Sequence, residues 1–273
     1  RFAEAGAGIQ ISPNAGRVLE ALDLGIALRR VAVRPEALAI SRWQGEAPLL
    51  RMPYAPPAPG ATPSRALKRA DLHQILLDAA RTLPNIRWLI GRGLLDCTET
   101  AAGLTVTLAS ESGQTETIEA MGLIGADGLW SRARELTGDT RPPRFTGWEA
   151  WRTLIPSAEV PSELRQPTIS LRLGSARHAV HYPVSAGKEI NLVLIRAARE
   201  ARPGWSRDGD ARDLTGIASG APIALRHLIE AAPGWQVWSL YDREPAAMAK
   251  GRIALLGDAA HPVLPFLAQG AAL

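Results

Sequence analysis

The sequence is short of the residues that build disulfide frameworks and membrane spans. It holds a single cysteine, Cys97, in 273 residues, which excludes a disulfide framework and a cysteine metal cluster and favours a reducing cytoplasm. Its apolar runs, such as Ile253–Leu256, are far too short to cross a bilayer. The chain begins at Arg1 rather than at a methionine, so we expect a piece of a longer protein, truncated at both ends.

The chain also lacks a large excess of charge of either sign. The 31 basic residues face 27 acidic ones, a net charge of +4, and the arginines are scattered rather than gathered in a run. A nucleic-acid-binding face needs clustered basic residues, so we expect no nucleic-acid partner. Hydrophobic residues make up 46% and charged residues 21% of the chain, as in a globular enzyme with a buried core.

Apolar spacing alternates between helical and strand-like along the chain. Helical spacing covers Ser12–Leu28 and Asp71–Leu83, while a hairpin is expected within Val31–Pro63. Several further segments are expected to be strands: Ile86–Ile90, Gly93–Glu99, Leu104–Ser110, Glu116–Glu119, Met121–Ile124, Trp148–Ile155, Thr168–Leu173, Ala179–Pro183, Ile190–Ile195, Gln236–Leu240 and Gly251–Asp258. Asp210–Ala232 is helical again. The order predicts an α/β fold of two interleaved domains.

One glycine-rich stretch is a poor candidate for a dinucleotide site. Gly6-Ala7-Gly8 has no strand before it, and Ile11 stands where the fingerprint needs a third glycine. We interpret it as a turn that leads into the helix at Ser12.

Two strand ends are better candidates. An apolar strand ends at Gly125 and is followed by Asp127-Gly128, and a second, fully apolar strand ends at Gly257-Asp258. Ligands of α/β sheets bind beyond such strand ends, and a carboxylate there suits the hydroxyls of ribose or ribitol. For Asp127, capping of the helix that follows is an equally good reading.

These segments together resemble the FAD-dependent aromatic hydroxylases, the group of salicylate hydroxylase and para-hydroxybenzoate hydroxylase. The stretch from Gly257-Asp258 through Pro265 to Ala268-Gln269-Gly270 resembles the second FAD signature of that family, although Ala268 replaces a frequent glycine. Gly125-Ala126-Asp127-Gly128 resembles its Asp-Gly motif, and Lys68-Arg69-Ala70-Asp71-Leu72 its Arg-x-x-Leu helix start. The amino-terminal βαβ unit of the family is missing.

The resemblance implies a doubly wound, Rossmann-like FAD-binding domain interleaved with a β-sheet substrate domain. It assigns residues 1–29, 65–145 and 245–273 to FAD, and residues 30–64 and 146–244 to the substrate. It implies NAD(P)H as reductant, O2 and a small aromatic substrate as partners, and a flavin C4a-hydroperoxide as the hydroxylating species. The cofactor-binding residues that it implies are Arg69, Asp127, Gly128, Gly257, Asp258, Pro265, Ala268, Gln269 and Gly270.

The substrate sheet offers candidates for the chemistry beside Pro265. Arg152 suits a substrate carboxylate, and His181 or Tyr182 suits a phenolic proton; a surface arginine and a packing aromatic are the alternatives. Strand alternation places His178 and His181 on opposite faces, which argues against a shared metal site. Hydroxylation or epoxidation of a polyprenyl or quinone precursor, and a non-catalytic fragment without FAD, stay open as alternative functions.

Overall fold

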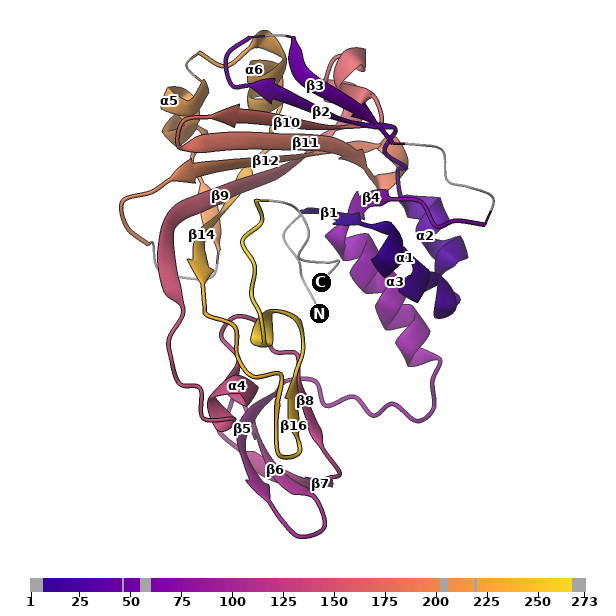
Figure 1. Cartoon of the computed structure of the whole chain (residues 1–273), viewed down its shortest axis with the longest axis vertical. Coiled ribbons are helices and arrows are strands. Elements are labelled where there is room, and N and C mark those ends of the chain that lie inside the picture. The colour runs from indigo at the N-terminus through magenta and orange to yellow at the C-terminus, as the bar shows by residue number, and fades with distance from the viewer. Residues whose placement is uncertain (1–6, 46, 55–59, 202–205, 219, 267–273) are drawn as a thin grey trace. The chain divides into compact units, whose positions relative to one another are not determined.

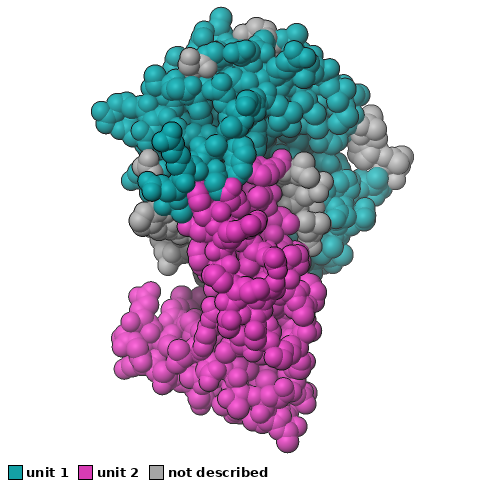
Figure 2. Space-filling model, turned by 60° about the vertical axis from the view of Figure 1, so that its left-hand side comes forward, with its two compact units in different colours: residues 1–83, 147–240, 272 teal, residues 84–146, 241–271, 273 magenta. Residues whose placement is uncertain are grey.

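The computed structural model describes residues 7–45, 47–54, 60–201, 206–218 and 220–266. Contacts divide the chain into two compact units, coloured separately in Figure 2. Unit 1 comprises residues 1–83 and 147–240 with residue 272, and unit 2 comprises residues 84–146 and 241–271 with residue 273. Both units are built from segments distant in sequence, and the mixed α/β architecture confirms the predicted fold class. No helix among the described residues combines the length and hydropathy that a membrane span requires.

An eight-stranded sheet dominates unit 1 (Figure 1). Its strands, in spatial order, are β13 (Arg207–Gly209), β14 (Trp235–Asp242), β9 (Arg144–Pro156), β12 (Glu189–Ala197), β11 (Arg177–Val184), β10 (Thr168–Gly174), β2 (Ala37–Arg42) and β3 (Pro48–Pro53). Strands β2 and β3 form the hairpin that the sequence predicts. Strand β10 pairs parallel with β2, whereas its other neighbour, β11, is antiparallel.

One face of this sheet packs on helices α5 (Thr215–Ala218) and α6 (Ile223–Glu230). The buried core there includes Trp151, Leu192, Leu214, Leu225 and Trp235. Two α-helices form where one helix was expected over Asp210–Ala232: the first ends at Ala218, and Pro222 is the N-cap residue of the second. We call this side of the sheet the helical face.

The opposite face meets a two-stranded sheet of β1 (Gly8–Ile11) and β4 (Arg65–Lys68). Helices α1 (Pro13–Ala21), α2 (Gly25–Val31) and α3 (Arg69–Arg81) pack on that small sheet around Leu28 and Leu67. The prediction of one helix over Ser12–Leu28 is wrong, because Asp23 adopts a left-handed φ of 60° and separates α1 from α2. Helix α3 confirms the predicted second helix within two residues at each end.

Gly8 corrects the reading of the glycine-rich stretch as a turn, because it begins strand β1. A Cβ at this position would lie 2.6 Å from Asn191 Cγ and 2.7 Å from Tyr182 Oη. The Gly8 amide donates a hydrogen bond to Asn191 Oδ1 at 2.6 Å. Only glycine allows β1 to approach β11 and β12 this closely.

Unit 2 contains two three-stranded sheets. The antiparallel sheet consists of β5 (Arg92–Glu99), β6 (Leu104–Ser110) and β7 (Thr115–Ala120), close to prediction. The other sheet consists of β15 (Ala249–Lys250), β16 (Ile253–Leu255) and β8 (Leu123–Gly125), with β16 parallel to β8, and is followed on the β8 side by helix α4 (Arg132–Leu136).

Two strand predictions in unit 2 fail. Residues 86–90 form no strand, and Ile86, Trp88 and Ile90 are exposed, so their alternation reflects no buried face. The segment 121–124 is not a buried strand either. Strand β8 begins at Leu123 and pairs with β16 on one side, and Met121 and Ile124 are 79% and 70% exposed.

The bounds of the two compact units differ from those of the predicted FAD-binding and substrate-binding domains. Residues 1–29 and 65–83 belong with the large sheet in unit 1, although the resemblance assigns them to FAD. A division by compactness and a division by ligand are different properties of a chain, so the FAD and substrate boundaries stay a prediction.

Candidate cofactor and substrate sites

The two predicted strand ends of unit 2 lie side by side. Leu255 of β16 is the register partner of Gly125 of β8, and the Leu256 amide donates to the Gly125 carbonyl at 2.8 Å. Because the strands are parallel, the segments that carry Asp127 and Asp258 leave the sheet at the same edge. The sequence predicted the two strand ends, and the structure shows that they are adjacent.

The glycines at this edge border open space. Gly128 has a φ of 75° and Gly257 a φ of 58°, and a Cβ built on either would meet no atom within 4 Å. Asp258 is exposed in the single turn 257–259. The Asp258 carboxylate is an exposed hydrogen-bond acceptor, and Gly128 and Gly257 hold backbone conformations that glycine adopts easily. Such a surface lets a dinucleotide approach the backbone closely. These residues therefore fit FAD.

Asp127 caps the helix that follows it. Its Oδ1 accepts from Ser131 Oγ at 2.6 Å, and its Oδ2 accepts from the amides of Arg132 and Ala133 at 2.7 and 3.0 Å. The capping alternative raised by the sequence is thus present in the structure. A role for the exposed carboxylate toward the cofactor stays a prediction.

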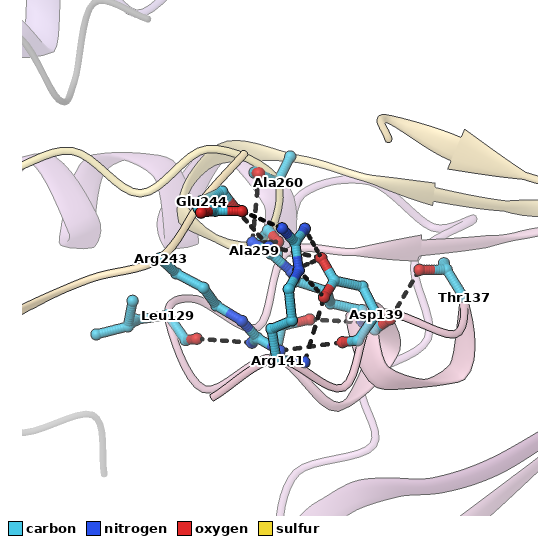
Figure 3. Close-up of polar contacts among 10 residues, drawn as sticks. Leu129, Thr137, Asp139, Arg141, Arg243, Glu244, Ala259 and Ala260 are labelled. Atoms are coloured by element: carbon cyan, nitrogen blue, oxygen red, sulfur yellow. Dashed lines mark hydrogen bonds and ion pairs between the residues drawn. The ribbon is translucent and has the colours of Figure 1, made fainter. Parts of the chain in front are cut away.

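A buried arginine joins the two strand-end segments, and sequence reasoning missed it. Arg134 is fully buried, and its Nη1 points at the carbonyls of Ala259 and Ala260, 3.5 Å away. Its Nη2 donates to the carbonyl of Glu244 and, at 2.7 Å, to Asp139 Oδ2; both of these partners are labelled in Figure 3. Arg134 lies seven positions after Asp127, but only the fold shows that the arginine turns inward.

The same carboxylate binds a second arginine. Arg141 donates to both oxygens of Asp139, and Arg243 donates to the Asp139 carbonyl at 3.1 Å and to the Leu129 carbonyl at 3.2 Å. The Arg141 and Arg134 hydrogen bonds hold the pKa of Asp139 well below its usual range. We call Arg134, Asp139, Arg141, Arg243 and Glu244 the arginine cluster.

The remaining predicted cofactor residues are Arg69, Pro265 and residues 268–270. Arg69 is exposed at the start of α3 in unit 1, and its amide donates to the Ala7 carbonyl at 2.8 Å. Pro265 is half-buried near the end of the described chain. Ala268, Gln269 and Gly270 lie outside the described residues, so their predicted roles stay predictions.

In unit 1, strand register decides which candidates share a face. Arg152 pairs with Val193 and Val193 with Val180, while the next row along contains Leu154, Asn191 and Tyr182. Arg152, Tyr182 and His178 therefore point to the side of the sheet opposite the helical face. We call this side the open face, because Arg152, His178, Val180 and Val193 are only half-buried on it.

Arg152 has the surroundings of a ligand-binding cation. Its guanidinium lies over the Trp238 ring, 5.1 Å from the centroid, and its charge acts on Tyr182. It also borders a cavity of about 570 Å³, together with Lys68, Leu154 and Trp235. Lys68 Nζ binds the Glu189 carboxylate at 3.0 and 3.2 Å, which fixes one wall.

Tyr182 and His181 are adjacent but point to opposite faces. Burial raises the pKa of the Tyr182 phenol above its usual range, although Arg152 and a hydrogen bond with Gln10 oppose that shift. Burial lowers the pKa of His181 to about 4, and the Arg172 charge adds to the effect. His181 therefore cannot serve a ring bound beside Arg152 and Tyr182. The half-buried residue on their face is His178, whose pKa burial also lowers.

The tryptophans of this sheet also lie on two different faces. Trp151 and Trp235 are buried in the core of the helical face, with ring centroids 6.3 Å apart, whereas Trp238 lies under Arg152. No group of three or more His, Cys, Asp or Glu side chains is placed to hold a metal ion in the described part of the chain.

Known proteins with this arrangement are flavoenzymes. The family model described as FAD binding domain matches residues 18–273. A 3-amino-4-hydroxybenzoate 2-monooxygenase of Streptomyces cremeus is 34% identical over 99% of this chain and 66% of its own. A 3-hydroxybenzoate 6-hydroxylase of Klebsiella oxytoca is 33% identical over 99% of this chain and 68% of its own.

The chain belongs to the family of FAD-dependent aromatic monooxygenases. A solved salicylate hydroxylase substrate complex is 26% identical with a TM-score of 0.79, over 97% of this chain and 68% of the other. The family membership confirms the resemblance seen in the motifs, and FAD is the family's cofactor. The chain spans about two thirds of the length of these relatives.

Proposed function

We propose that the whole protein hydroxylates a carboxylated phenol ring of the hydroxybenzoate class, with FAD as cofactor and with NAD(P)H and O2 as co-substrates. The observation that carries the proposal is Arg152, which lies on the same face as Tyr182 and His178, stacks on Trp238 and borders a cavity. The names of the curated relatives point the same way, since they act on hydroxybenzoates. The reaction converts ring, O2, NAD(P)H and a proton to hydroxylated ring, water and NAD(P)+.

The guanidinium of Arg152 binds the ring carboxylate. A carboxylate that enters a half-buried site loses hydration, and a charge-assisted, bidentate partner offsets that cost. The Trp238 ring beneath the guanidinium restricts its orientation by a cation–π contact. Lys68 is less available, because Glu189 holds its ammonium group.

His178 and Tyr182 handle the phenolic proton. Because burial lowers the pKa of His178 from an ordinary value of about 6.5, its imidazole is neutral near pH 7 and accepts a proton. Tyr182 keeps its proton at that pH and donates a hydrogen bond. We propose His178 in place of His181, which faces the other side of the sheet.

FAD, when bound, takes electrons from NAD(P)H and activates oxygen. Gly128, Gly257 and Asp258 are the residues that would hold it in unit 2, with Asp127, Arg69 and Pro265 as further predicted contacts. The protein's own contribution is to orient the ring and to exclude water. We also propose a cytoplasmic location, on the evidence of the single cysteine.

The test uses the full-length protein. Purified protein should carry a flavin absorption spectrum, and hydroxybenzoates should stimulate NAD(P)H oxidation and yield a product heavier by one oxygen atom. Colourless protein that takes up no FAD would contradict the cofactor assignment. Flavin-loaded protein that responds to neutral phenols or prenylated quinone precursors, and not to hydroxybenzoates, would contradict the substrate class.

A further inference from the structure

A second cavity lies on the helical face, with its floor formed by one row of side chains. Ser170 of β10 pairs with His181 of β11 and with Ala39 of β2, and Ala39 pairs with Arg51 of β3. Cross-strand partners share a face, so these four residues cross four strands in a line. Ser170, His181 and Arg51 of this row line the cavity, which measures about 270 Å³.

A short segment after β9 covers this row. The single turn Ser162–Arg165 contributes Glu163 and Leu164, and Pro167 follows it. The Arg165 guanidinium donates twice to the Val160 carbonyl, at 2.8 and 2.6 Å, and Val160 is itself buried. The covering segment is therefore tied to the core of unit 1.

His181 is the most buried polar residue that lines the cavity. The residue is only 6% exposed, and its ring makes no hydrogen bond within the described part of the chain. His181 lines the cavity, and its nitrogens are not fully enclosed, unlike the partnerless Nδ2 of Asn191. A neutral imidazole offers one N–H donor and one acceptor nitrogen, and a buried polar group without a partner is costly. A ligand would satisfy it.

Charge decides which kind of ligand fits. The lining holds the carboxylates of Glu36 and Glu163 against one guanidinium, that of Arg51. Arg172 lies nearby, but its Nη1 donates to the carbonyls of Arg42 and Gly45 at 3.4 and 2.9 Å. An ammonium group can donate to the carboxylates and to the acceptor nitrogen of His181, whereas a carboxylate would be repelled.

We propose that this cavity is a second small-molecule site, which binds a primary ammonium group on a compact apolar body. The body packs against Leu164 and Pro167, and the ammonium lies between His181 and Glu163. At about 30 Å³ per water, the volume is that of about nine waters, so a ligand of the size of benzylammonium fits. The site is independent of the proposed hydroxylation.

Calorimetric titration of the flavin-loaded full-length protein tests the site, with benzylammonium, benzyl alcohol and benzoate as probes. Benzylammonium should bind at least tenfold more tightly than benzyl alcohol. Glu163→Gln should weaken that binding three- to tenfold, and His181→Leu should abolish it. Glu159→Gln is the matched control, since Glu159 is exposed, lies three positions before Ser162 and does not line the cavity.

Benzoate separates this site from the proposed substrate site, because its binding should be unchanged in both variants. Glu163 is exposed, so its substitution leaves folding intact even if His181→Leu does not. Benzylammonium that binds no better than benzyl alcohol, or that binds Glu163→Gln and Glu159→Gln with equal affinity, overturns the proposal. Failure of benzoate to bind would count against the proposed function alone.

Discussion

Arg134 and Asp139 form a buried ion pair in which Nε and Nη2 of the guanidinium donate to one carboxylate oxygen, at 2.9 and 2.7 Å. The guanidinium also reaches the carbonyls of Ala259 and Ala260, directly after Asp258. A single buried cation thus connects the helix after β8 to the turn after β16. The geometry of the proposed FAD edge depends on this connection.

Replacement of the buried cation should be costly. Arg134→Gln leaves Asp139 and three backbone carbonyls short of donors, and loss of one partner of a buried pair costs about 3–5 kcal/mol. Urea unfolding of the full-length protein measures this. Arg141→Gln is the matched control, because Arg141 binds the same carboxylate but is half exposed, and its loss should cost much less. Equal losses in the two variants would contradict a special role for Arg134.

The arginine cluster also predicts an acid dependence. Hydrogen bonds from Arg141 and Arg134 depress the pKa of Asp139 in the folded state, so the stabilisation is present above the unfolded pKa of about 3.9. It is lost progressively as the pH falls below that value. The difference in urea midpoint between wild type and Asp139→Asn should therefore shrink between about pH 5 and pH 2. A difference that does not change over this range would argue against the linkage.

Asp127 should act on stability through its cap and on reduction through its charge. Asp127→Ala should lower the free energy of unfolding by about 0.5–2 kcal/mol, and it should slow reduction of the bound flavin by NAD(P)H. Ser131→Ala is the comparison, because Ser131 caps the same helix by accepting from the Arg134 amide but carries no charge. If both variants reduce at the wild-type rate in stopped flow, Asp127 is a helix cap alone.

Asp258 should affect cofactor affinity and little else. Its side chain is exposed, so Asp258→Ala should change the free energy of unfolding of the apoprotein by less than about 0.5 kcal/mol. Loss of a charge-assisted acceptor should weaken FAD binding by about ten- to a hundredfold, equivalent to about 1.5–3 kcal/mol. Titration of apoprotein with FAD, followed by flavin fluorescence, measures the change. Wild-type affinity in the variant would remove Asp258 from the site.

Arg152 should discriminate between charged and neutral rings. Arg152→Met should raise the dissociation constant of hydroxybenzoates by about tenfold or more and leave that of neutral phenols nearly unchanged, since only the former lose an ionic partner. Arg177→Met is a matched control, because Arg177 also lies over a tryptophan, Trp43, at 4.9 Å. Equal effects on both ring types would return Arg152 to a packing role.

The sequence predicted features that depend on short segments. The two strands that precede Asp127 and Asp258 were foreseen, though not their parallel pairing, because an apolar run followed by glycine and aspartate is a local pattern. Helix α3 was foreseen because its apolar residues recur at helical spacing. In α3 the apolar residues Leu72, Ile75 and Ala79 are partly buried against the core around Leu28 and Leu67.

Features that depend on distant pairing were not predictable. Alternation alone separates His178 from His181, but the register of β9, β12 and β11 is needed to put Arg152 on the face of His178. Arg134 meets Ala259 across 125 residues of sequence, and no local signal marks that contact. Strand-like alternation at 86–90 misled because a strand also needs a partner.

The adjacency of His181 and Tyr182 limits how the β10–β11 hairpin can change in evolution. A two-residue turn, Ser175 and Ala176, links the register partners Gly174 and Arg177. Loss or gain of one residue there would shift β11 by one position and exchange its two sets of side chains. The His181 imidazole would then lie on the open face, beside the proposed substrate, and the Tyr182 phenol would lie on the helical face. Length variation in this hairpin should therefore be tolerated only in steps of two.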